Sequence, residues 1–207
     1  MVDSYLTLSQ QTWRHEIVVE KSRFIATACR VAGPQAAADV VKAVAKQYVG
    51  ATHHCYAYVT TQGQKFADAG EPQGTAGLPI LKAVQQQNLC DVVVVVTRYF
   101  GGVKLGTGGL ARAYGRAASE VLAQASKVRL VPCAVFTVTG DYAQANAIET
   151  TAHALGQIIA QDYQTAVAYQ IAVPLPQADA FTRQLADALR GTPDCTRLPD
   201  AMVEFGV

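Results

Sequence analysis

The chain has 207 residues, of which 50% are hydrophobic and 16% are charged, and its formal net charge is +1. This composition excludes a disordered chain, and the glycines and prolines show no period that would indicate a collagen-like protein. The longest aliphatic run, Val92 to Val96, is far shorter than the roughly 20 residues that a membrane-spanning helix needs. Because residues 1–10 also lack the pattern of a secretory signal, we expect a cytoplasmic protein without membrane contact.

The five cysteines are an odd number and include no Cys-x-x-Cys pair. A disulfide framework and a zinc ribbon are therefore disfavoured, and we expect reduced thiols. For the chain as a whole we expect no metal and no cofactor.

Charge is distributed unevenly along the chain. Residues 1–130 hold 14 Lys and Arg against 8 Asp and Glu, a balance of +6, whereas residues 131–207 hold 3 against 8, a balance of −5. This contrast predicts two domains, 1–130 and 131–207, which have different partners or attract each other.

The first part of the chain alternates between strand-like and helix-like hydrophobic patterns. It predicts strands at 13–19, 23–30, 54–60 and 91–98, and helices at 34–48, 79–88 and 107–127. The order ββαβαβα indicates a layered domain of the α+β or α/β class.

The second part of the chain shows a different order of predicted strands and helices. It predicts strands at 131–139, 157–163, 165–173 and 196–205, with one helix at 141–155 and another that ends at Gly191. The order βαββαβ is that of the ferredoxin-like fold, so the whole chain is assigned to the α+β class.

A glycine-rich loop between the strand at 91–98 and the long helix that follows carries the strongest chemical signal. A helix start offers unpaired amides and a positive dipole end, with Thr107 as the expected cap and Gly108 and Gly109 leaving the amides open. Cations surround this position, and the residues predicted to bind an anion or a nucleic acid are Arg98, Lys104, Thr107, Gly108, Gly109, Arg112 and Arg116. The alternative is a tight turn followed by a solvated helix face. P-loop and Rossmann fingerprints do not match the spacing.

An earlier glycine-rich loop contains two carboxylates, Asp68 and Glu71. They could serve acid–base catalysis or bind magnesium, but the preferred interpretation is that they accept backbone hydrogen bonds that shape the loop, with a bridge to Arg98. On the preceding strand His53 and Cys55 share one face and His54 points to the other. These residues could bind a metal or form a nucleophile, or one histidine could be buried and the other face a cleft.

The motifs together resemble the IMPACT/YigZ family. The resemblance is carried by His53-His54-Cys55, by the loop from Asp68 to Gly77, and by Arg98 to Leu110 with Ala113-Tyr114-Gly115. The residues of the motif loop are His53, His54, Asp68, Gly70, Glu71, Pro72, Gly74, Thr75 and Gly77. The family pattern expects a second acidic residue after Asp68, where this chain has Ala69, so a metal site made of two aspartates is less well supported.

The resemblance implies an N-terminal domain with the ribosomal-protein domain-2-like fold, shared with domain IV of elongation factor G. It also implies a C-terminal domain similar to domain V of that factor. Eukaryotic members bind the co-activator of the kinase that phosphorylates initiation factor 2, and bacterial members are linked to nucleic acid or the ribosome. We therefore expect a translation-linked regulator that binds RNA or a ribosomal partner, and not an enzyme. The alternatives are a protein-binding adaptor without RNA contact and a hydrolase that uses His53, His54, Asp68 and Glu71.

Overall fold

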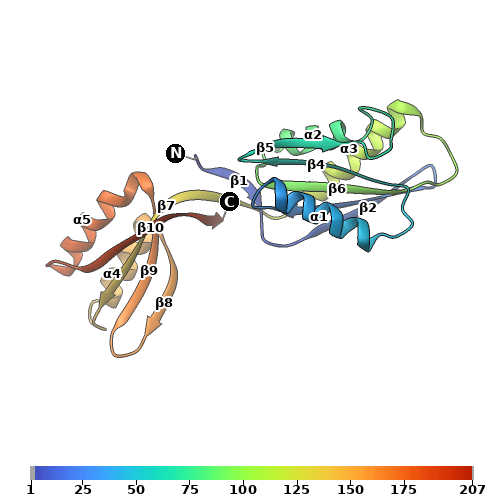
Figure 1. Ribbon diagram of the computed structural model, residues 1–207. Helices are drawn as coiled ribbons and strands as arrows, with labels where there is room; N and C mark the ends of the chain where they lie inside the picture. Colours follow the sequence, from blue (N-terminus) through green and yellow to red (C-terminus); the bar gives the residue numbers. More distant parts are fainter. Residues whose placement is uncertain (1–2, 207) are drawn as a thin grey trace. The chain divides into compact units, whose positions relative to one another are not determined.

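The computed structural model describes residues 3–206, which form two compact units (Figure 1). Residues 5–129 with Gly206 make up the N-terminal unit, and residues 130–205 with residues 3–4 make up the C-terminal unit. Each unit is described by itself. In the described part of the chain, no helix is both long and apolar enough to cross a membrane.

The N-terminal unit is built on one antiparallel sheet. In chain order its elements are β1 (Tyr5–Leu8), β2 (Trp13–Val19), β3 (Ser22–Arg30), α1 (Pro34–Gln47), β4 (His53–Thr60), β5 (Gly63–Ala67), α2 (Gly77–Gln86), β6 (Val92–Tyr99) and α3 (Gly106–Gln124). The strands of the sheet lie in the order β2-β3-β6-β4-β5. The apolar strand β6 is thus central and pairs with β3 and β4.

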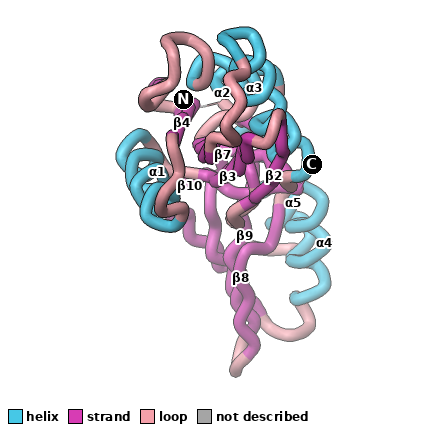
Figure 2. Tube along the Cα trace, turned by 90° about the vertical axis from the view of Figure 1, so that its right-hand side faces the viewer, coloured by secondary structure: helices cyan, strands magenta, loops and turns pink. Residues whose placement is uncertain are grey.

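The central position of β6 explains its unbroken run of valines. Val92, Val94 and Val96 pack in one cluster with α2 and α3, while Val93 and Val95 pack in another with α1. A strand that is covered on both faces needs apolar side chains on both, so the usual alternation disappears. Figure 2 shows α1 on one side of the strands and α2 with α3 on the other.

Two short strands were not predicted, and several helix ends differ from the prediction: the helix expected from Asp141 begins at Ala145, and the helix expected at 79–88 spans Gly77–Gln86. β1 contains only four residues, and β5 is an edge strand whose side chains are largely exposed, so neither shows the alternation that marks a half-buried strand. The helix predicted to reach residue 127 ends at Gln124, because Ala125 adopts an extended conformation and the next strand begins at Lys127.

The C-terminal unit has the predicted βαββαβ order. Its elements are β7 (Lys127–Gly140), α4 (Ala145–Leu155), β8 (Gln157–Tyr163), β9 (Val167–Pro174), a 3-10 turn (Leu175–Gln177), α5 (Ala178–Leu189) and β10 (Asp194–Gly206). The first residues of β7 belong to the N-terminal unit. β10, β7, β9 and β8 follow one another in the ferredoxin-like order, and β1 also pairs with β7, which makes this sheet five-stranded. The α+β class predicted from the sequence is therefore confirmed.

Candidate functional site

The first glycine-rich loop is held in shape by the carboxylate of Asp68. Its Oδ2 accepts the amide of Gly74 at 2.8 Å, and its Oδ1 accepts the amides of Ala76 at 3.0 Å and Gly77 at 2.8 Å. Gly77 is the first residue of α2, and no side chain of the N-cap residue caps that helix. Asp68 therefore caps α2 from outside the helix. Burial alone would raise the pKa of this carboxyl, but the three amides outweigh burial and lower it.

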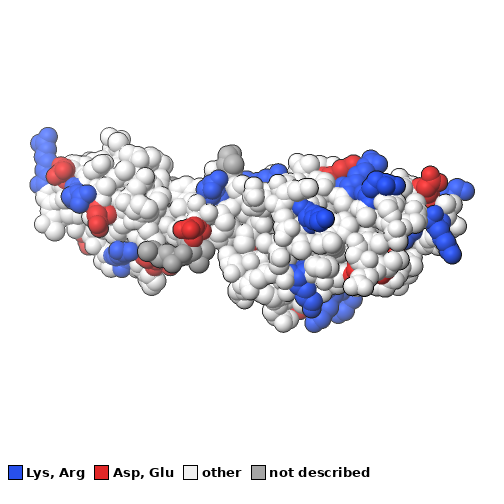
Figure 3. Space-filling view, turned by 90° about the horizontal axis from the view of Figure 1, so that it is seen from above, with Lys and Arg blue, Asp and Glu red and all other residues white. Residues whose placement is uncertain are grey.

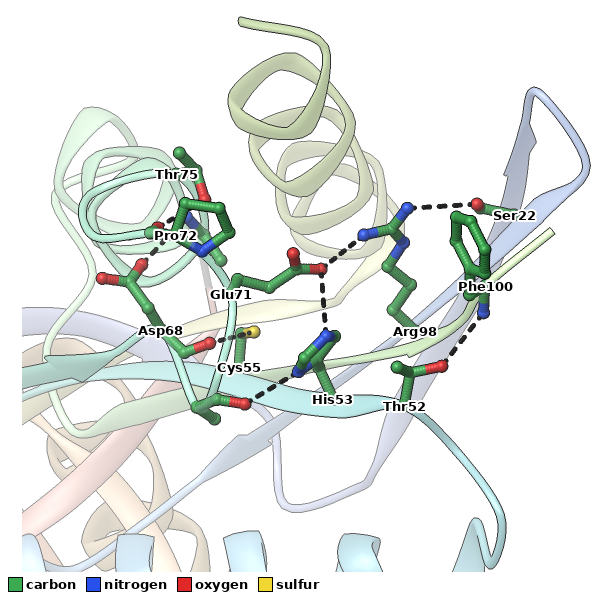
Figure 4. A network of polar contacts seen from close by, with 12 residues as sticks. Ser22, Thr52, His53, Cys55, Asp68, Glu71, Pro72, Thr75, Arg98 and Phe100 are labelled. Carbon is green, nitrogen blue, oxygen red and sulfur yellow. Dashed lines mark hydrogen bonds and ion pairs between the residues drawn. The ribbon is translucent and has the colours of Figure 1, made fainter. Parts of the chain in front are cut away.

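Glu71 occupies the centre of a buried polar network (Figure 4). Its Oε1 lies 2.7 Å from Nη1 of Arg98 and accepts the hydroxyl of Tyr114, also at 2.7 Å. The side chains of Glu71 and Arg98 are only 4% and 6% exposed. This pair ties the first glycine-rich loop, residues 68–76, to the end of β6, where the second glycine-rich loop, residues 100–105, begins.

His53 faces the same carboxylate. Its Nδ1 lies 2.9 Å from the carbonyl oxygen of Ala69 and its Nε2 lies 3.9 Å from Glu71. Because a carbonyl can only accept, Nδ1 carries a proton and donates it, and Nε2 is the atom turned to Glu71. The ring thus fastens the loop to β4, on which it is mounted.

The two residues that follow His53 behave as the strand alternation predicts. His54 turns away and its Nδ1 lies 3.1 Å from the hydroxyl of Thr97, and burial, followed by the charge of His53, lowers the pKa of His54. Cys55 is fully buried, its thiol donates to the carbonyl of Asp68 at 2.9 Å, and burial raises its pKa to about 12. A thiol held in that protonated state is a poor nucleophile.

Arg98 differs from its predicted role as a free anion-binding cation. In addition to Glu71, its guanidinium donates to the hydroxyl of Ser22 at 3.3 Å and lies 5.4 and 5.5 Å from the ring centres of Phe24 and Phe100. Of the two carboxylates expected to bridge to Arg98, Glu71 makes the bridge. The charge of Arg98 is therefore neutralised by Glu71 inside the unit, and the pair holds the two loops together.

The start of α3 also differs from the prediction. The helix begins at Gly106 with Leu105 as its N-cap residue, and no side chain of that residue caps it, so Thr107 lies inside the first turn and is exposed. A Cβ added to Gly101 would lie 2.0 Å from the backbone of Lys21, so this glycine lets the second loop pass close to the β2–β3 turn.

The remaining motif residues shape the first loop. Gly70 and Gly74 adopt positive φ angles of 92° and 76°, and the hydroxyl of Thr75 donates to the carbonyl of Pro72 at 2.6 Å. A Cβ on Gly77 would lie 2.8 Å from the backbone of Ala67, so only glycine lets α2 begin this close to β5.

Two hollows adjoin at the second loop. We call the larger the basic groove; it has a volume of about 510 Å³, and Val19, Glu20, Lys104, Gly109, Arg112 and Arg116 are among the residues that line it. We call the smaller the Phe100 pocket; it has a volume of about 270 Å³ and is lined by residues that include Glu71, Pro72, Arg98, Phe100, Thr107 and Leu110. Lys104 and Leu105 line both hollows, so the two are neighbours.

The cations of the basic groove are open to solvent. Lys104 and Arg112 are exposed and make no ion pair with any residue between 3 and 206. Arg116 pairs with Glu120 at 2.7 Å, one turn further along α3, yet its side chain is 60% exposed. Glu20 is the acidic residue that lines this hollow. On the face that Figure 3 shows, Lys and Arg are spread over the N-terminal unit with fewer Asp and Glu between them.

The structure thus divides the predicted anion-binding residues into two groups. Lys104, Gly109, Arg112 and Arg116 gather at the basic groove, whereas Arg98 and Thr107 line the neighbouring pocket. Gly108 lines neither hollow, although a Cβ placed there would lie 3.5 Å from the guanidinium of Arg112.

Tyr114 and Ser22 were not predicted as members of this network. The sequence placed Tyr114 on the apolar face of the long helix, and it is fully buried there. The available signal was its phenol, because a buried tyrosine hydroxyl usually requires a partner. Within residues 3–206, no three side chains of His, Cys, Asp or Glu are grouped so that they could hold a metal ion.

The chain is similar to proteins of one family along most of its length. The model of the Impact N-terminal domain matches residues 20–122, and a domain of unknown function, DUF1949, matches residues 138–192. The IMPACT family member YvyE of Bacillus subtilis is 37% identical over 198 residues, which cover 94% of this chain and 91% of that protein. The IMPACT family member YigZ of Escherichia coli is 37% identical over 180 residues, which cover 84% and 88%. A crystal structure described as that of a hypothetical protein is 33% identical with a TM-score of 0.64, over 96% of this chain and 99% of the other.

Proposed function

Because the chain belongs to the IMPACT family, we propose that it is a translation-linked regulatory protein that binds RNA through the basic groove. A place in the cytoplasm, where RNA and ribosomes are found, is part of this proposal. The family likeness supports the link to translation, and the charges of the groove support the kind of ligand.

The observation that carries the proposal is the geometry of the basic groove. Arg112 and Arg116 lie one helical turn apart on α3, and Lys104 approaches the same hollow from the preceding loop. Cations that are exposed and spaced along a helix face match a phosphate backbone, from which they displace condensed counterions. The helix start adds a positive dipole end beside Lys104.

The buried network gives this surface a fixed shape. Glu71 and Arg98 hold the two glycine-rich loops together, and Asp68 fixes the start of α2. The loop that carries Lys104 follows β6 directly, so the bond between Arg98 and Glu71 anchors the start of this loop. A ligand that meets preformed cations loses less entropy on binding than one that has to order them.

Titration of labelled single-stranded RNA at several salt concentrations tests the proposal. If Lys104, Arg112 and Arg116 each contact one phosphate, the log–log slope is about −2, which amounts to a roughly 20-fold loss of affinity between 50 and 200 mM salt. The double variant Arg112→Ala/Arg116→Ala is expected to retain a slope of only about −0.7.

Lys42→Ala is the matched control. Lys42 lies on α1, which covers the other face of the sheet, and its side chain is 71% exposed, so the variant removes one exposed cation outside the groove. We expect it to bind RNA like the wild-type protein. A wild-type protein that binds no RNA at low salt, or a Lys42 variant as weak as the double variant, would show that the groove is not an RNA site.

A further inference from the structure

The Phe100 pocket lies directly beside the basic groove and has a different lining. Phe100, Pro72, Leu105 and Leu110 give it apolar walls, and its polar lining residues are Glu71, Arg98, Lys104 and Thr107. We infer that this pocket receives one unpaired base of an RNA strand whose phosphates lie in the basic groove. The inference rests on the proposed function and specifies its substrate: single-stranded or looped RNA instead of a duplex.

The ring of Phe100 is partly exposed at the pocket and can stack on a planar ring. Its side chain lies at the rim of the pocket and is 49% exposed, and its amide donates to the hydroxyl of Thr52 at 3.1 Å. The guanidinium of Arg98 lies 5.5 Å from the ring centre, and Figure 4 shows the two side chains next to each other. The amide bond holds the backbone of Phe100, and the buried cation lies against one face of its ring. A base that stacks on it therefore meets an aromatic surface that is already ordered.

The size of the pocket restricts the occupant. At about 270 Å³ it is smaller than the roughly 300 to 1,000 Å³ of pockets that hold drug-sized ligands, so it admits one ring system. The polar groups of its lining are Glu71 and Arg98, which already bind each other, and the exposed Lys104 and Thr107. The edge of a nucleobase carries both donors and acceptors. An apolar hollow with such a polar wall fits a base better than it fits an aliphatic side chain.

The shared wall connects the base to its phosphate. Lys104 and Leu105 line both hollows, and a base and its own phosphate are joined through a single sugar. A strand that places phosphates against Arg112 and Arg116 can therefore turn one base over Lys104 into the pocket. In a duplex the bases are paired and stacked inside the helix, so the pocket would stay empty.

Phe100→Ala separates this inference from the proposed function. Labelled oligo(U), a duplex RNA of the same length and inorganic polyphosphate, a polyanion without bases, serve as probes. For Phe100→Ala we expect a roughly 5- to 150-fold loss of oligo(U) affinity with an unchanged salt slope. Binding of the duplex and of polyphosphate is expected to stay the same. Arg112→Ala should weaken all three ligands and lower the slope for oligo(U) by about 0.7.

The outcomes distinguish the two proposals. If Phe100→Ala binds oligo(U) within twofold of the wild-type protein, or if duplex and single strand bind equally tightly, the base pocket is refuted while RNA binding by the groove stands. If the wild-type protein binds neither RNA, both proposals fail. Phe100→Leu keeps an apolar side chain without the ring and should resemble Phe100→Ala. The unfolding curve of Phe100→Leu, compared with that of the wild-type protein, shows whether the N-terminal unit is still folded.

Discussion

Replacing Glu71 by glutamine tests whether the buried ion pair organises the N-terminal unit. Glutamine has nearly the same shape and can still accept hydrogen bonds from Arg98 and Tyr114, but the negative charge is lost. Both partners of the pair are at least 94% buried, so Arg98 would keep a positive charge with little solvent to compensate it. Removal of one partner from a buried pair costs about 3 to 5 kcal/mol, and we expect Glu71→Gln to destabilise the unit by that amount.

An exposed pair in the same unit provides the matched control. Glu16 binds Arg23 at 2.8 Å, about the same length as the buried pair, but these side chains are 40% and 51% exposed. Because water screens such a pair, Glu16→Gln should cost less than about 1 kcal/mol. The residue types and the distances match, so the difference between the two variants reports burial together with the bond from Tyr114 that only Glu71 accepts.

Urea unfolding followed by tryptophan fluorescence measures both variants. Trp13 is the single tryptophan of the chain and lies on β2, so the signal reports on the N-terminal unit. The double variant Glu71→Gln/Arg98→Met should recover part of the loss, because no buried charge is left without its partner. Equal costs for Glu71→Gln and Glu16→Gln would refute the structural role assigned to the buried network.

Three further predictions follow from the same loops. The lowered pKa of Asp68 means that its stabilisation is complete above the pKa of the unfolded chain and disappears as pH falls through the folded pKa. Asp68→Asn should therefore lower the free energy of unfolding by about 2 kcal/mol near neutral pH and by much less in acid. The control variant Asp39→Asn, at an exposed position, should change the free energy of unfolding little at either pH. Urea unfolding at both pH values measures the two variants. Gly101→Ala should lower the melting temperature because the added Cβ would collide with the backbone of Lys21. Gly108→Ala lies inside α3 with room for a methyl group, so it should stabilise the unit by up to about 1 kcal/mol. Thermal melts of the two variants should therefore shift in opposite directions. Alkylation of the native protein followed by mass spectrometry should leave Cys55 unmodified, because its thiol is buried and its pKa is raised to about 12, and rapid labelling of Cys55 without unfolding would contradict this placement.

Strong local patterns allowed most of the fold to be predicted. The valine run of β6 and the helical spacing of α3 place the central strand and the longest helix, and the order βαββαβ identifies the C-terminal unit. Elements without such a pattern were missed. β5 contributes few buried side chains, so its existence depends on pairing with β4 and not on its own sequence.

Most residues of the candidate site were also visible in the sequence, although Tyr114 and Ser22 were not, and the separate roles of these residues could not be predicted. Strand alternation indicated that His53 and Cys55 share a face, and the glycine-rich loops indicated close backbone approach. The sequence could not show that Arg98 turns inward while Arg112 stays exposed, since both are arginines in a basic, glycine-rich stretch.

The sequence by itself therefore determined which residue types were present, how they repeat and which elements they favour, because these depend on neighbours along the chain. The partnership of Glu71 with Arg98, 27 positions apart, came only from the tertiary structure. The register of the sheet sets His53 opposite Arg98, and the packed face of α3 brings Tyr114 to the same carboxylate. Burial then separates the two kinds of arginine, because a charge in the interior must be paired whereas the same charge on a helix face stays in contact with solvent.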